Sequence, residues 1–166
     1  MPIARHFTST AFVVNNGYLA LHWHAKVQTW LPPGGHLEEN EDPVQAVLRE
    51  VEEETGLTVE IVPTGSQFDL EYPSQVIPPF TIMVEDIYDS DKGHHQHIDM
   101  IYICCPTSPA NPTELNEGWL WVSRDSLTEG IPLKRNNGLE ATPPGDVVEL
   151  AKFAFQVVDD LSNKSA

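Results

Sequence analysis

The sequence has few basic residues, few cysteines and no long apolar run. Nine lysines and arginines stand against 25 aspartates and glutamates, so the net charge is −16 over 166 residues. With so few cations, no basic stripe is available to displace counterions, which argues against long DNA or RNA as a partner. No apolar run approaches the length that crosses a membrane. A small, metal-complexed phosphate compound remains compatible with this charge.

Cysteine is limited to Cys104 and Cys105, which are adjacent in an apolar run. Adjacent cysteines do not form the spaced framework of a disulfide-rich protein, and we interpret them as buried thiols of a strand. Residues 1–7 also lack the apolar core of a signal peptide. These observations predict a protein of the reducing cytoplasm.

Length and patterning predict one domain, residues 1–166, of mixed α/β (α+β) content. β-rich runs predict strands at 8–14, 18–24, 58–62, 80–88, 97–105 and 118–122. We expect turns at 15–17 and 91–93, loops at 28–40, 63–80 and 106–117, and a short turn at 123–127 that starts a helix. Residues 146–161 predict an amphipathic helix whose inward face is Val147, Leu150, Ala151, Ala154, Val158 and Leu161.

Residues 49–54 read Arg-Glu-Val-Glu-Glu-Glu and precede Gly56, an arrangement that a helix should avoid. Like charges three and four positions apart repel. Acidic groups in a last turn also face the negative end of the helix macrodipole. A local rule broken in this way indicates a site, and the compensating partner we expect is a hard divalent cation with oxygen ligands.

The helix around these carboxylates is otherwise well specified. Asp42 is a good N-cap, Pro43 is the first helical residue, Gln45 completes a capping box, and Gly56 is placed to end the helix. The apolar stripe is formed by Val44, Val47, Leu48 and Val51. At 100° per residue, the side chains of a second face fall within about 100° of each other. These are Glu50, Glu53 and Glu54, whereas Glu52 points elsewhere.

Residues 35–57 resemble the Nudix box of the Nudix (MutT-like) hydrolases. Every specified position of that pattern is filled, by Gly35, Glu41, Arg49, Glu50, Val51, Glu53, Glu54, Gly56 and Leu57. The flanking segments 30–35 and 119–122 also look like the family. The resemblance implies a Nudix-type α/β/α sandwich with a mixed β-sheet. It also implies a Nudix pyrophosphohydrolase that cleaves a phosphoanhydride bond in a nucleoside diphosphate-linked small molecule.

The resemblance further implies roles for single residues. Glu50, Glu53 and Glu54 would bind Mg²⁺, with Mn²⁺ as an alternative, and one of them, or a glutamate of another loop, would be the general base. Arg49 would belong to the catalytic group by orienting Glu50 or Glu41 through charge-assisted hydrogen bonds. An ordinary surface ion pair is the alternative for Arg49.

The loop before the helix supplies the predicted substrate-binding residues. Gly34 and Gly35 allow close approach of the backbone, and Glu38 in the same loop could reach the metals. A plain turn and a solvated carboxylate are the alternatives. A further metal-binding carboxylate is expected from a distant loop. We predict Glu117 for this role, with Glu114, Glu85 and Asp99 as the other candidates.

Histidines 94, 95 and 97 could form a metal-binding tract. Histidine prefers softer ions than the oxygen site does, and a polar turn leading into a strand is the favoured interpretation.

The substrate is left open between a nucleoside triphosphate and ADP-ribose. Pro73 lies sixteen residues past the box, as in ADP-ribose hydrolysing members of the family. Phe68, Tyr72 and Phe80 could stack on a base, or simply pack locally. A non-catalytic Nudix-fold sensor that binds a nucleotide is the alternative function. An acidic protein with a merely solvated helix face is a third. Dimers are common in the family, so a homodimer is a further possibility.

Overall fold

The structure is a computed structural model that describes residues 3–89, 93–108, 115–135 and 137–164. Its elements, in chain order, are β1 (Arg5–Asn15), β2 (Tyr18–His24), β3 (Thr29–Leu31), β4 (Gly34–His36), α1 (Pro43–Thr55), β5 (Val59–Ile61), β6 (Thr81–Asp89), β7 (Gly93–Pro106), β8 (Trp119–Ser123), α2 (Arg124–Thr128), β9 (Leu133–Lys134), β10 (Glu140–Ala141) and α3 (Gly145–Lys164). The turn predicted at 91–93 overlaps residues 90–92, which lie outside the described residues.

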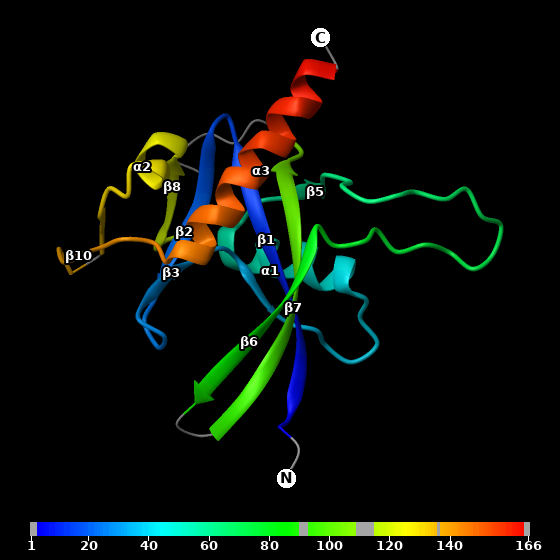
Figure 1. Cartoon of the computed structure of the whole chain (residues 1–166), viewed down its shortest axis with the longest axis horizontal. Helices are drawn as coiled ribbons and strands as arrows, with labels where there is room; N and C mark the ends of the chain where they lie inside the picture. Colours follow the sequence, from blue (N-terminus) through cyan, green and yellow to red (C-terminus); the bar gives the residue numbers. More distant parts are fainter. Residues whose placement is uncertain (1–2, 90–92, 109–114, 136, 165–166) are drawn as a thin grey trace.

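Eight strands form one mixed sheet with β1 and β7 at its centre (Figure 1). Its main order is β3-β2-β1-β7-β5, and β4, β6 and β8 pair with β1, β7 and β2. β1 and β7 run parallel over nine residue pairs, from Arg5 opposite Gln96 to Val13 opposite Cys104. The other pairs in this sheet are antiparallel. The mixed sheet expected from the sequence is therefore confirmed.

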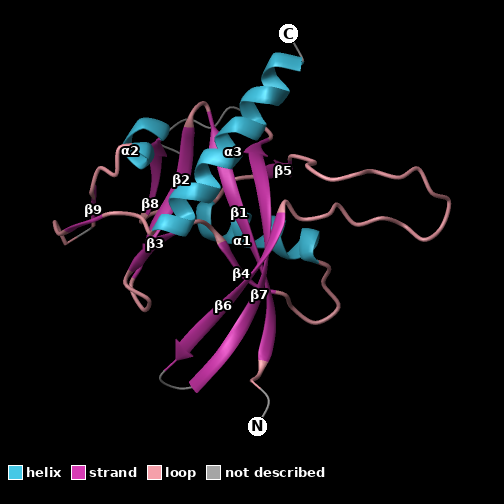
Figure 2. Ribbon diagram, viewed as in Figure 1, coloured by secondary structure: helices cyan, strands magenta, loops and turns pink. Residues whose placement is uncertain are grey.

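Alternating residues of β1 enter two separate cores. Phe12 and Val14 pack in a cluster with the inward face of α3, whereas Ala11 and Val13 pack in a cluster with the apolar stripe of α1. Because successive side chains of a strand point to opposite faces, the two helices cover opposite sides of the sheet. This is the predicted α/β/α sandwich, and Figure 2 shows α3 crossing the sheet with α1 on its other side.

The predicted helices α1 and α3 and the β1–β2 hairpin are confirmed. The structure differs from the prediction where strands pair with partners far along the chain. The expected loop at 28–40 contains β3 and β4, which exist because β2 and β1 supply their partners. β7 begins at Gly93 and not at the predicted His97, so His94 and His95 lie in the strand and not in a turn, because β6 extends the pairing to Gly93. Leu161 was expected to face inward but is 39% exposed, since the last turns of α3 run past the sheet.

The segment between β5 and β6 leaves the body of the molecule as a long excursion (Figure 1). Of the three aromatic residues considered for base stacking, Phe68 and Tyr72 are exposed on this excursion. Phe80 instead packs against the α3-side core, with its ring 6.2 Å from that of Phe153. Among the described helices, none combines the length and apolar character needed to cross a membrane.

Candidate active site

Helix α1 carries Glu50, Glu53 and Glu54, which are called the acidic face below. The helix is capped as the sequence predicts. The Asp42 carboxylate accepts hydrogen bonds from the backbone N–H groups of Val44 and Gln45, at 2.8 and 3.0 Å. The Gln45 side chain accepts from the Asp42 N–H at 2.9 Å, which completes the capping box. Gly56 ends the helix at φ 76°, a left-handed conformation that glycine adopts without a steric penalty. The carboxylates are thus carried by a helix with fixed ends.

Two of the three carboxylates are held by strand β4, which precedes α1. The Gly34 N–H donates to Oε2 of Glu54 at 3.0 Å. Glu50 lies against Gly35, where a Cβ atom added to the glycine would be 2.6 Å from the Glu50 Cδ. Glu53 is the most open of the three, with 61% of its side chain exposed. Strand β4 and helix α1 therefore build the acidic face together.

Burial and the neighbouring carboxylates together disfavour the charged form of Glu54. Burial raises the pKa of this carboxyl to about 7, and the charges of Glu50 and Glu53 act in the same direction. The hydrogen bond from the Gly34 N–H opposes the rise and does not cancel it. The three carboxylates of this helix face offer oxygen donors only, which is the ligand set of Mg²⁺ or Mn²⁺ and not of a soft metal. The residues present fit a hard divalent ion.

Arg49 bridges the acidic face to the loop. Its Nε and Nη2 atoms donate to the two carboxylate oxygens of Glu41, both at 2.9 Å, as a bidentate pair. Its Nη1 atom donates to Glu50 at 2.8 Å and lies 3.3 Å from Glu53. Nη2 also donates to the carbonyl of His36 at 3.2 Å. The contacts predicted from Arg49 to Glu41 and to Glu50 are both present, and the planar guanidinium sets the position of each carboxylate.

The predicted substrate-binding loop residues differ in their surroundings. A Cβ atom at Gly34 would lie 2.6 Å from the Ser9 carbonyl oxygen, so this glycine is required by close packing against β1. Glu38 is exposed, and its N–H donates to Glu41 at 2.9 Å. Both glycines thus permit the close backbone approach predicted for them. Contact of these residues with a substrate stays a prediction.

Over residues 4–142 the chain matches the model of the NUDIX domain family. The chain belongs to this family. Among solved structures it resembles a NUDIX family hydrolase from Clostridium perfringens, with 26% identity and a TM-score of 0.71 over 94% of this chain and 99% of that one. As a member of the family with a hydrolase fold, the chain is a Nudix pyrophosphohydrolase.

Two more distant structures share the Nudix fold with this chain. One is the MutT protein from Methanosarcina mazei Go1, with 16% identity and a TM-score of 0.55 over 94% of this chain and 96% of that one. The other is a NUDIX hydrolase from Nitrosomonas europaea, with 18% identity and a TM-score of 0.53 over 92% and 88%. At these identities the likeness concerns the fold alone. No curated protein matches the sequence.

Glu117, the predicted additional metal ligand of this Nudix site, is exposed. It lines a hollow of about 430 Å³ together with His22, Trp23, Trp30, Trp119 and Arg135, among other residues. The residue before it, Asn116, contacts α1 directly, because its Nδ2 donates to the Glu54 carbonyl at 3.1 Å. Metal binding by Glu117 stays a prediction, while its loop is anchored at the carboxyl end of α1.

Asn116 is the residue near the Nudix site that the sequence did not indicate. Its backbone N–H donates to the Thr55 carbonyl at 3.0 Å, and its side chain satisfies the last carbonyls of α1. The last carbonyl groups of a helix have no partner within the helix, so an amide donor there is stabilising. No local pattern marks Asn116, because the contact spans about 60 residues of chain. Glu114 lies outside the described residues.

The two strand carboxylates considered as alternatives lie on the α3 side of the sheet. Asp99 is buried and accepts a hydrogen bond from the Thr8 hydroxyl at 2.9 Å. Burial raises the pKa of Asp99, and the hydroxyls of Thr8 and Thr10 oppose that rise. Burial raises the pKa of Glu85 to about 7, and the charge of Asp99 adds to the effect. The two carboxylates thus interact with each other across β6 and β7.

Proposed function

We propose that this Nudix hydrolase uses Mg²⁺, with Mn²⁺ as an alternative, to cleave a phosphoanhydride bond in a nucleoside diphosphate-linked small molecule. Nucleoside triphosphates and ADP-ribose are the two candidate substrates. One observation carries the proposal. One face of α1 carries Glu50, Glu53 and Glu54. Gly34 and Gly35 of β4, together with Arg49, hold this face in place. The charge of −16 argues against long nucleic acid as the substrate.

The chain's own residues position the acidic groups. Glu54 would be held for the metal by the Gly34 N–H, and Glu50 by Arg49. When bound, Mg²⁺ would neutralise charge on the phosphate oxygens and make a coordinated water more acidic. Glu53, the most exposed of the three, is the carboxylate most open to an incoming phosphate and water. We propose that one of these glutamates, or a glutamate of another loop, accepts the proton of the attacking water.

The test is a substrate panel with Mg²⁺ and, in parallel, Mn²⁺. The panel contains nucleoside triphosphates including oxidised ones, ADP-ribose, dinucleoside polyphosphates and nucleotide sugars, with release of phosphate-containing products as the readout. Glu53→Gln is the test variant, and Glu52→Gln is the matched control, because Glu52 is exposed on the same helix. Loss of a preorganised charged group from a transition state typically costs about 100-fold or more in rate.

We expect turnover of one substrate class, a loss of about 100-fold in Glu53→Gln, and little change in Glu52→Gln. Equal losses in the two variants would show that activity depends on the total negative charge of the helix and not on the acidic face in particular. Tight binding of one ligand with no turnover by the unmodified chain would instead support the sensor function.

Two further parts belong to the same proposal. A homodimer is proposed from the family resemblance, and a cytoplasmic location is proposed from the cysteines. Both thiols are free, with Cys104 buried and Cys105 half-buried. Sedimentation equilibrium of the purified chain tests the dimer, and a single species at the mass of one chain, 18.5 kDa, would contradict it. Imaging of the tagged chain in cells tests the location.

A further inference from the structure

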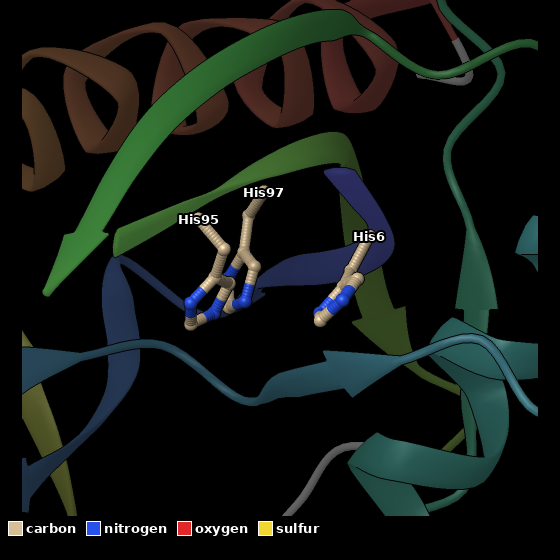
Figure 3. Close-up of side chains that lie close together, drawn as sticks. All are labelled: His6, His95 and His97. Atoms are coloured by element: carbon tan, nitrogen blue, oxygen red, sulfur yellow. The ribbon is translucent and has the colours of Figure 1, made fainter. Parts of the chain in front are cut away.

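Three histidines from two strands meet on the α3 side of the sheet. Ligand nitrogens of His6, His95 and His97 all lie within 4.8 Å of one another. The ring centroids are 5.0 Å apart for His6 and His95, 5.2 Å for His95 and His97, and 6.2 Å for His6 and His97. Figure 3 shows the three rings in a row below the strands that carry them. This cluster is called the histidine triad below.

The parallel pairing of β1 and β7 brings the triad together. His6 lies directly opposite His97 in the register, so the two side chains leave the sheet on the same face. His95 precedes His97 by two residues and therefore shares that face, whereas His94 points to the other one. The triad thus depends on a contact between the two ends of a long stretch of chain, and it is built into the sheet and not into a loop.

His95 is prepared as a metal ligand by its second nitrogen. The residue is buried, with 4% exposure. Its Nδ1 lies 3.1 Å from the carbonyl oxygen of Gly93, and because a carbonyl only accepts, Nδ1 carries the hydrogen. The lone pair is then on Nε2. Metal-ligating histidines commonly use this arrangement, in which one ring N–H donates to a backbone carbonyl and orients the other nitrogen.

We propose that His6, His95 and His97 form a zinc site separate from the carboxylate site of α1. Three neutral imidazoles are a ligand set for borderline ions such as Zn²⁺, whereas Mg²⁺ prefers oxygen. Three protein ligands leave the fourth position of a tetrahedral ion for water or another group. With Zn–N bonds of about 2.1 Å, two ligand nitrogens stand about 3.4 Å apart. Since the ligand nitrogens lie within 4.8 Å of one another, binding would bring each pair closer by at most about 1.4 Å.

The surroundings of the triad favour a cation. Glu85 lies opposite His97 on β6, and Asp99 follows His97 by two residues, so both carboxylates are on the same face of the sheet. In its ionised form, each of these carboxylates adds to the attraction of a divalent ion. The neutral form of an imidazole is the form that binds metal.

The triad also touches the strand that leads to the active site. The His36 ring lies 4.7 Å from the His97 ring and 5.5 Å from the His6 ring. The carbonyl of His36 accepts a hydrogen bond from Arg49 at 3.2 Å. An ion held by the triad would therefore fix the position of β4, which carries Gly34 and Gly35.

The experiment is calorimetric titration of the chelator-treated, full-length chain with Zn²⁺ in excess Mg²⁺. Excess Mg²⁺ would occupy the carboxylates of α1, as the proposed function requires, and leave the triad as the site under test. The test variants are His6→Gln and His97→Gln. The matched control is His94→Gln, since His94 lies in the same strand but on the other face, where it contacts Asp86. Thermal unfolding without metal verifies that each variant is folded.

We expect one Zn²⁺ per chain, unchanged affinity in His94→Gln, and a loss larger than about tenfold in His6→Gln and His97→Gln, since even outer-shell partners contribute tenfold or more. Co²⁺ should give a visible spectrum with tetrahedral intensity that disappears in the same two variants. Equal Zn²⁺ affinity in all four proteins would overturn the proposal and leave the rings as packing only. Loss of Zn²⁺ binding in Glu53→Gln would place the ion on α1. No step of this test requires a substrate, so its failure is distinct from failure of the proposed hydrolysis.

Discussion

The Glu50 carboxylate occupies the space that a side chain at position 35 would need. A Cβ atom on Gly35 would lie 2.6 Å from the Glu50 Cδ, which is closer than real Cβ contacts come. The same carboxylate receives a hydrogen bond from Arg49 at 2.8 Å. The glycine of the Nudix box and the first glutamate of its acidic face therefore form one unit, in which the missing side chain sets the position of the carboxylate.

Gly35→Ala should separate activity from stability. The atoms that must move belong to the end of a flexible side chain, so we expect the free energy of unfolding to change by less than about 1 kcal/mol. The displaced Glu50 carboxylate should lower kcat by about 100-fold, because misplacement of an active-site group by an ångström has effects of that size. Chemical denaturation and steady-state kinetics on the best substrate of the panel measure the two quantities.

Gly34→Ala and Gly145→Ala complete the comparison. At Gly34 the new methyl would meet the Ser9 carbonyl oxygen at 2.6 Å and the Thr10 Cα at 2.8 Å, and neither backbone atom can rotate away. We expect a loss of about 1–3 kcal/mol in stability there. At Gly145 no atom lies within 4 Å of the added group, so both quantities should be unchanged. A Gly35→Ala protein as destabilised as Gly34→Ala would contradict the interpretation.

Arg49→Lys should impair catalysis although it keeps the charge. Arg49 uses three nitrogens for Glu41, Glu50 and the His36 carbonyl, and an ammonium cannot reproduce this planar fork. We expect kcat to fall between about tenfold and 100-fold through loss of the Glu50 position. The matched control is Arg124→Lys, which alters the ion pair with Asp159 outside the site. If both variants keep full activity, Arg49 is an ordinary surface ion pair.

Asn116→Ala should weaken the carboxyl end of α1. The Asn116 amide donates to the carbonyls of Glu53 and Glu54, and loss of such a hydrogen bond costs about 1 kcal/mol. Asn116→Asp should be more harmful than the alanine variant. It removes the donor and adds negative charge at the negative end of the helix dipole. Chemical denaturation gives the ranking, and equal stability of the alanine and aspartate variants would argue against a capping role.

The helices and the hairpin were largely predictable from local sequence rules. The capping box at Asp42, the glycine stop at Gly56 and the apolar stripes of α1 and α3 all follow from spacing, because helix contacts are local in sequence. The acidic face and its link to Arg49 followed from the motif. These are the parts of the site in which residues within one short segment define the geometry.

The parts that sequence reasoning missed depend on partners far along the chain. Strand β4 is three residues long and exists because β1 lies beside it. His94 and His95 were interpreted as a polar turn leading into the strand that begins at His97, since nothing local reveals that β1 pairs in parallel with β7. The contact of His6 with His95 and His97 follows only from that register. Long-range pairing is thus the information that periodicity and propensity lack.

The stability of the fold should depend on pH through His22. This ring stacks on Trp119 with centroids 4.3 Å apart. Burial, with a smaller contribution from His24, lowers the pKa of His22 from 6.5 to about 4. Between these values the unfolded chain binds a proton that the folded chain does not, so the free energy of unfolding should rise with pH across this window. The slope contributed by one such group is at most about 1.4 kcal/mol per pH unit.

His22→Gln isolates this contribution. Glu85 acts in the opposite direction, because its raised pKa, about 7, lets the folded chain bind the extra proton as the pH falls. The total slope of the unmodified chain therefore mixes both signs, and the difference between the two proteins is the quantity to measure. Chemical denaturation at a series of pH values from 4 to 7 should give a variant whose slope of stability against pH is lower than that of the unmodified chain. Parallel curves of unfolding free energy against pH would mean that His22 is protonated equally in the folded and unfolded states. Its burial would then have no effect on its pKa.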